Sequence, residues 1–186
     1  MLTAQDLKKG VILVRNGEPW LVADVTRSKM AQRELMVKAK LKSLKKGNTL
    51  EVTHRSDDPI EEADVTKKSL KYLYKDNTSY YFMDDKFEQY EVMAEGLQEK
   101  SVYLVEDASV DGIFWNDQLY DIILPKKLIF KVISSPPGVK GDSATSGTKP
   151  ATIETGATVQ VPLFVDEGDK IAINTETGQY VERVNG

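Results

Sequence analysis

The sequence of 186 residues contains no cysteine. This absence excludes disulfide bonds, cysteine nucleophiles and thiolate metal sites, including zinc fingers, and it suits a protein of a reducing compartment. Histidine is almost as scarce, with His54 as the single example. A serine–histidine or metal–histidine site would therefore have to be built around one predicted strand residue, so an enzymatic function has little support.

Long apolar runs and helical periodicity are also missing. No run approaches the roughly 20 residues that cross a bilayer, and the N-terminal MLTAQDLKKG lacks the apolar core of a signal peptide. We therefore expect a cytoplasmic protein that does not contact a membrane. The one plausible helical stretch, about residues 92–97, should be short because Gly96 costs about 1 kcal/mol inside a helix.

Short alternating stretches separated by turn residues make up most of the chain. Asn16-Gly17 and Asn116-Asp117 favour tight hairpin turns between strands. A composition shift at residues 60–64 and the Pro125-Lys126-Lys127 link divide the chain further. We predict an all-β protein of three small barrels, which span residues 1–64, 65–127 and 128–186.

Charge is distributed unevenly along the chain. Residues 1–56 carry 12 Lys and Arg against 5 Asp and Glu, or +7, and the other residues carry 13 against 24, or −11, which together give the formal net charge of −4. A basic head can be drawn to phosphates while an acidic body is held away from them. The alternative is that charge simply varies along the chain.

Residues 22–44 read as a hairpin with a lysine-rich return strand. Because side chains alternate in a strand, Val37, Ala39 and Leu41 should share one face, and the opposite face should carry Lys38, Lys40 and Lys42. The lysine face can contact RNA, or it can be the ordinary solvated face of an antiparallel sheet. A second feature is the loop over residues 136–150, rich in glycine, proline and hydroxyl residues, since loops this long are more often functional than not.

Residues 149–168, KPATIETGATVQVPLFVDEG, resemble the signature of the bacterial elongation factor P family. A lysine, an alanine, a glycine, a Val-Pro pair and a final glycine stand at the family's spacings. Residues 137–142 resemble its long loop, residues 177–184 its last strand, and residues 87–89 a motif of its middle part. The resemblance covers essentially the whole chain.

This resemblance implies an L-shaped protein of tRNA size, with an SH3-like or KOW-like barrel followed by two OB-fold barrels. It implies a monomeric, non-enzymatic elongation factor without metal or cofactor. Its partners would be the 70S ribosome, peptidyl-tRNA, ribosomal RNA and mRNA, and its task the relief of stalls at poor substrates such as consecutive prolines. The hairpin tip would face the CCA end of the tRNA, the three lysines would contact the RNA backbone, and the long loop would lie near the messenger through Gly141, Asp142, Ser143, Gly147 and Lys149.

The tip departs from the family pattern of Pro-Gly-Lys-Gly with a modified lysine. Alignment without gaps puts Gln32 at the lysine position, and glutamine cannot accept a lysine-type extension. Either the protein works unmodified, or a gapped alignment brings Lys29 or Arg33 to the tip, and a modifying enzyme is then an open alternative. We rank Arg33 first, because its planar donors suit phosphates and bases, then Lys29, then Gln32. A further alternative is a paralogue that has lost this mechanism.

Two other functions compete with this hypothesis. A general single-strand RNA-binding protein could stack bases on Tyr72, Tyr74, Tyr81 and Phe82, although alternating aromatics are more often core residues and the middle of the chain is acidic. An enzyme would need His54 or the pairs Asp57-Asp58 and Asp84-Asp85. The histidine is more simply explained as solvated or facing RNA, and the aspartates as turn residues.

Overall fold

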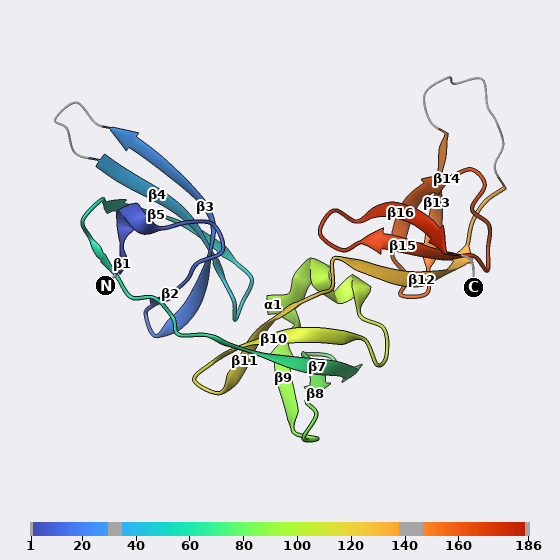
Figure 1. Ribbon diagram of the computed structural model, residues 1–186, viewed down its shortest axis with the longest axis horizontal. Coiled ribbons are helices and arrows are strands. Elements are labelled where there is room, and N and C mark those ends of the chain that lie inside the picture. The colour runs from blue at the N-terminus through green and yellow to red at the C-terminus, as the bar shows by residue number, and fades with distance from the viewer. Residues whose placement is uncertain (1, 30–34, 138–146, 185–186) are drawn as a thin grey trace. The chain divides into compact units, whose positions relative to one another are not determined.

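The computed structural model describes residues 2–29, 35–137 and 147–184. It divides into two compact units, one of Met1–Gln98 with Val110–Ile123 and the other of Glu99–Ser109 with Leu124–Gly186. Antiparallel sheets dominate both units, as predicted, and Figure 1 shows them along the chain. Within the described residues, no helix has the length and apolar character needed to cross a membrane.

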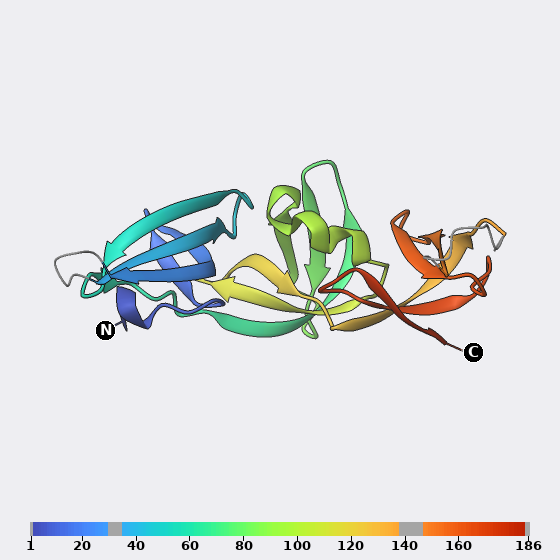
Figure 2. The same cartoon turned by 90° about the horizontal axis from the view of Figure 1, so that it is seen from above.

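The first sheet holds four strands in chain order, and they lie side by side in both views (Figure 1, Figure 2). They are β2 (Ile12–Arg15), β3 (Glu18–Lys29), β4 (Leu35–Ser43) and β5 (Thr49–Arg55). The predicted hairpin turn between β2 and β3 is confirmed, because Asn16 and Gly17 have φ angles of 53° and 71°. A short ladder of β1 (Leu2–Thr3) with β6 (Pro59–Ile60), and the 3-10 helix η1 (Ala4–Asp6), accompany this sheet. The buried core comprises Ala4, Leu7, Leu13, Trp20, Val22, Val37, Ala39, Leu41 and Ile60.

The second sheet has the order β11-β10-β7-β8-β9. Its strands are β7 (Thr66–Lys75), β8 (Ser79–Met83), β9 (Gln89–Met93), β10 (Ser109–Trp115) and β11 (Gln118–Ile123). The predicted hairpin at Asn116-Asp117 is confirmed, with φ angles of 49° and 61°. The helix α1 (Ala94–Leu97) is short, as expected, but begins two residues late because residues 92 and 93 end β9, and the 3-10 helix η2 (Gln98–Tyr103) follows it.

The turn after β4 packs closely against α1 within the first unit. The Gln98 side-chain amide donates a hydrogen bond to the Gly47 carbonyl at 3.0 Å. A Cβ atom on Gly96 would lie 2.7 Å from the Leu44 carbonyl oxygen, so only glycine fits there without a shift. Gly96 disfavours the helix, but the close approach of the Leu44 backbone requires a glycine at this position.

The third sheet has the order β14-β13-β12-β15-β16. Its strands are β12 (Lys127–Ser134), β13 (Thr148–Ile153), β14 (Thr158–Pro162), β15 (Lys170–Asn174) and β16 (Gln179–Val184). The prediction that the loop extends to residue 150 is wrong, because β13 begins at Thr148. Pro150 is tolerated there because it lies in the part of β13 that pairs with β14 alone. Its partner is Gln160, and the ladder to β12 is formed farther along the strand, at Thr152 and Ile153.

Candidate nucleic-acid interface

The long ladder of β3 with β4, which we call the arm, runs from the pair Trp20 and Ser43 to the pair Lys29 and Leu35. A register shift between Val22 and Asp24 marks a bulge near its base, and bulges increase local twist. Of the predicted tip residues, Lys29 is the last residue of β3. Gln32 and Arg33 lie outside the described residues.

The three lysines of β4 share one face, as the alternation predicts. Lys38 and Lys40 are exposed and Lys42 is half-buried. The residues between them, Val37, Ala39 and Leu41, are at most 1% exposed and belong to the core. One face of the strand therefore packs inward while the ammonium groups point away from the core.

Two carboxylates interrupt the lysine face. Lys40 pairs across the sheet with Asp24 of β3 on one side and with Glu51 of β5 on the other. The Lys38 ammonium lies 2.6 Å from a Glu51 carboxylate oxygen. The hydrogen bond and the charge of Lys38 lower the pKa of the Glu51 carboxyl, and Lys40 adds a smaller effect. The face is therefore less positive than three lysines alone suggest, and Lys38 already has a partner.

Arg27 braces the arm against the N-terminal segment. Its guanidinium donates hydrogen bonds to the carbonyl oxygens of Gln5 at 3.0 Å and Leu7 at 2.7 Å. Arg27 is paired with the buried Val37, so it occupies a position of the inward face. This role of Arg27 was not predicted from the sequence. The signal was available, because Arg27 is a charged residue at a strand position on the apolar face.

His54 is half-buried, whereas the sequence favoured a solvated position. It pairs with Val37 across β4 and β5, on the inward side, and its side chain is 18% exposed. Its Nδ1 atom lies 3.7 Å from a carboxylate oxygen of Asp58. Within the described residues, no group of three or more acidic or histidine side chains is arranged to hold a metal ion.

The base of the third-sheet loop is held by a buried lysine. Lys149 is 5% exposed, and its ammonium donates a hydrogen bond to the Pro136 carbonyl at 2.8 Å and lies 3.5 Å from Asp166. Gly147 is exposed, and its carbonyl accepts a bond from the Leu163 amide at 3.3 Å. The other predicted loop residues, Gly141, Asp142 and Ser143, lie outside the described residues.

The aromatic residues of the second sheet are mostly occupied by the protein itself. Tyr72 and Phe82 are 8% and 0% exposed, so neither can stack on a base. Tyr74 and Tyr81 stack on each other with ring centroids 4.7 Å apart. These contacts argue against the single-strand stacking alternative.

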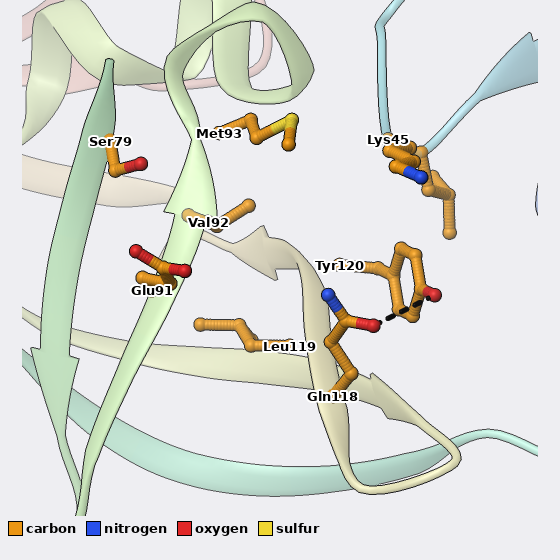
Figure 3. Close-up of a pocket in the computed structure, with 9 residues that line it drawn as sticks. Lys45, Ser79, Glu91, Val92, Met93, Gln118, Leu119 and Tyr120 are labelled. Atoms are coloured by element: carbon orange, nitrogen blue, oxygen red, sulfur yellow. Dashed lines mark hydrogen bonds between the residues drawn. The ribbon is translucent and has the colours of Figure 1, made fainter.

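A small cavity of about 70 Å³ lies beside β9 and β11, and Figure 3 shows the residues that line it. Polar groups in its lining include Ser79, Glu91 and Gln118, and the Tyr120 hydroxyl donates to the Gln118 side chain at 3.1 Å. Sites for small molecules usually measure roughly 300–1,000 Å³. This cavity has room for about two waters and not for a cofactor.

Three family models match the chain in succession. They are described as the elongation factor P KOW-like domain over residues 3–60, the elongation factor P OB domain over residues 65–122, and the elongation factor P C-terminal domain over residues 129–183. The chain is 42% identical to elongation factor P of Brachyspira hyodysenteriae over 186 residues, which is 100% of both chains. It is 42% identical to that of Persephonella marina over 180 residues, covering 96% of this chain and 95% of the relative. The protein of the same name from Synechocystis is 36% identical over 186 residues and 100% of both chains.

Proposed function

The chain belongs to the elongation factor P family, and from this premise we propose how its parts act on the ribosome. It is a translation elongation factor and not an enzyme, and membership of this family implies interaction with the ribosome. We propose that it binds the 70S ribosome beside peptidyl-tRNA, with contacts to ribosomal RNA and mRNA. There it promotes peptide-bond formation at poor substrates such as consecutive prolines.

The observation that carries this proposal is the arm. Ten residues of β3, from position 20 to 29, span roughly 33 Å at about 3.3 Å each, which is long enough to carry the tip into an RNA cleft. The brace from Arg27 to Gln5 and Leu7 supports a defined direction for the arm. Holding the end of the peptidyl-tRNA in a reactive geometry lowers the barrier without any chemical group from the protein, by several kcal/mol in favourable cases.

Two further contacts are proposed, one between the lysines of β4 and the RNA backbone and one between the third-sheet loop and the messenger. Lys40 and Lys42 would approach the RNA backbone, and Lys38 could join them only by leaving Glu51. Lys149 would act near the messenger indirectly. Because its ammonium is covered, it would hold the ends of the loop in place while Gly141, Asp142 and Ser143 make the contact.

The proposal can be tested by reconstituted translation of two messages, one with consecutive prolines and one without. The wild-type chain should raise the yield of the first message only. Arg33→Ala or Lys29→Ala should remove this gain, whereas Lys131→Gln, on the exposed face of β12, should not. An equal effect of the wild type on both messages would contradict the proposal.

Mass spectrometry of the native protein decides between the two versions of the tip. A mass addition at Lys29 would mean that a modifying enzyme extends this residue. An unmodified peptide across residues 27–33 would mean that the side chains themselves, with Arg33 first, make the contact at the CCA end of the tRNA.

A further inference from the structure

The turn between β8 and β9 is fixed by an unusually complete set of hydrogen bonds. The Asp84 amide donates to the Glu88 carbonyl at 3.0 Å, and the Phe87 amide donates to the Asp84 carbonyl at 3.2 Å. One carboxylate oxygen of Asp84 accepts from the amides of Lys86 at 2.9 Å and Glu88 at 3.0 Å. The Tyr90 hydroxyl lies 3.0 Å from the other oxygen of Asp84 and 2.7 Å from Glu88. The turn therefore has one well-defined backbone conformation.

Phe87 occupies the position in this turn where a large residue is least favourable. Its φ angle is +63°, in the left-handed region that favours glycine and asparagine. Among the described residues other than glycine with positive φ, four of six are Asn or Asp, and Gln98 makes the side-chain bond to Gly47. Phe87 is the remaining one.

Burial does not offset this backbone strain. Phe87 is 80% exposed, the highest value among the exposed large apolar residues that the structure describes. The Tyr90 side chain that bonds to Asp84 is itself held in place, because the Lys68 ammonium lies 5.1 Å from the centroid of the Tyr90 ring and 4.7 Å from that of Phe114. No contact among the residues that the structure describes explains a strained, exposed aromatic residue on a rigid turn, so we look for the explanation in binding to a partner.

We propose that Phe87 is a pre-organised anchor that inserts into an apolar pocket of a partner protein whose rim carries lysine or arginine. Aromatic anchors in pockets supply much of the energy of protein interfaces, and a rigid turn lowers the entropy lost on binding. The charge of the turn selects this partner class. The three carboxylates of the turn, Asp84, Asp85 and Glu88, outnumber its cations. These are Lys86 on the turn and Lys68 of β7, whose ammonium lies 3.3 Å from the Tyr90 hydroxyl.

The same charges argue against RNA as the partner. Stacking of bases on an exposed aromatic residue is accompanied in proteins by basic groups that follow the phosphates. Here the turn carries three carboxylates, at Asp84, Asp85 and Glu88, against one lysine, and carboxylates repel phosphates. This inference rests on the proposed function in one respect, since the partner is expected among the proteins of the ribosome.

The first experiment separates stability from binding. Phe87→Gly removes the ring and relieves the backbone, so it should raise the Tm of the free protein by about 3 °C. It should also weaken binding to ribosomes stalled on a consecutive-proline message by about tenfold or more. Phe87→Tyr keeps the ring and should bind as the wild type does. A lower Tm for Phe87→Gly, or an unchanged affinity, would overturn the proposal.

The second experiment identifies the partner class. A photoreactive benzoylphenylalanine at position 87 should form a cross-link to a protein on the same stalled ribosomes, and the same group at position 86 should do so much less. A cross-link from position 87 to RNA would overturn the assignment. If the wild type did not bind ribosomes at all, the proposed function would be rejected. Normal ribosome binding with no effect at position 87 would reject the anchor alone.

Discussion

At the scale of single residues, Asp76 shows how an exposed carboxylate can become a stabilising group. One of its oxygens accepts bonds from the amides of Thr78 at 2.8 Å and Ser79 at 2.7 Å, and the other accepts from the Tyr81 hydroxyl at 2.9 Å. These bonds, the two from the backbone first, lower the pKa of Asp76 to about 2, and the bond to Asp76 raises the pKa of Tyr81 to about 12. Both shifts mean that the turn before β8 is built around an ionised aspartate.

The sign of the Asp76 shift predicts a pH dependence. Because the folded pKa lies below the unfolded value of about 3.8, the stabilisation is present above pH 4 and is lost as the pH falls toward 2. Wild type should therefore be more stable than Asp76→Asn at pH 5, and the difference should shrink by pH 2. Urea unfolding at several pH values measures it, with Tyr81→Phe as a variant that removes one donor only. A difference that stayed constant down to pH 2 would argue against this role of the carboxylate.

Lys149 gives a second prediction, for a cation that is buried. Lys149→Met removes the donor to the Pro136 carbonyl and should destabilise the third sheet by about 1–3 kcal/mol. Asp166→Asn removes only the partner whose side chain is 78% exposed, and it should cost less than about 1 kcal/mol. Hydrogen exchange of the β13 and β14 amides measures both variants. Equal losses of protection would mean that the ion pair, and not the hydrogen bond to Pro136, fixes the loop base.

At the scale of elements, local sequence patterns correctly predicted the features that depend on neighbouring residues, namely tight turns and the faces of strands. The hairpin turns at Asn16-Gly17 and Asn116-Asp117 and the inward set of β4 followed from two-residue turn preferences and strand alternation. The partners of the lysine face could not be predicted, because the position of Asp24 beside Lys40 depends on a bulge that shifts the register of β3. Strand β13 was missed because Pro150 and its neighbours have the composition of a loop, and that composition does not show their pairing with β12 and β14.

The contact between α1 and the turn after β4 leads to a prediction in which helix propensity and packing disagree. Propensity alone favours Gly96→Ala by about 1 kcal/mol. The new Cβ would lie 2.7 Å from the Leu44 carbonyl oxygen, so the variant should instead be destabilised by about 1–3 kcal/mol. Gly147→Ala is the matched control, since nothing lies within 4 Å of its new Cβ. Circular dichroism during urea unfolding would report the loss in Gly96→Ala and its absence in the control, and a gain in stability would contradict the close contact.

At the scale of the whole molecule, the charge of +7 over residues 1–56 and of −11 over the rest predicts that the proposed contact with RNA is concentrated in residues 1–56. Each phosphate contact made by a lysine releases counterions, so the number of contacts can be read from the salt dependence of binding. The arm and the third sheet both expose lysines. A comparison between them therefore tests whether the net charge of a region, or any exposed lysine, determines binding.

The double variant Lys40→Gln with Lys42→Gln should bind ribosomes with a weaker salt dependence. The slope of log K against log[salt] should become less negative by about 1.5, because two phosphate contacts are lost at about 0.7–0.9 each. Lys131→Gln with Lys170→Gln removes two exposed lysines that face each other across β12 and β15, and it should leave the slope unchanged. Glu51→Gln should have the opposite effect to the first pair, since it releases Lys38 from its ion pair and so allows a further contact. Equal slopes for both double variants would mean that the lysine face of the arm is an ordinary solvated face.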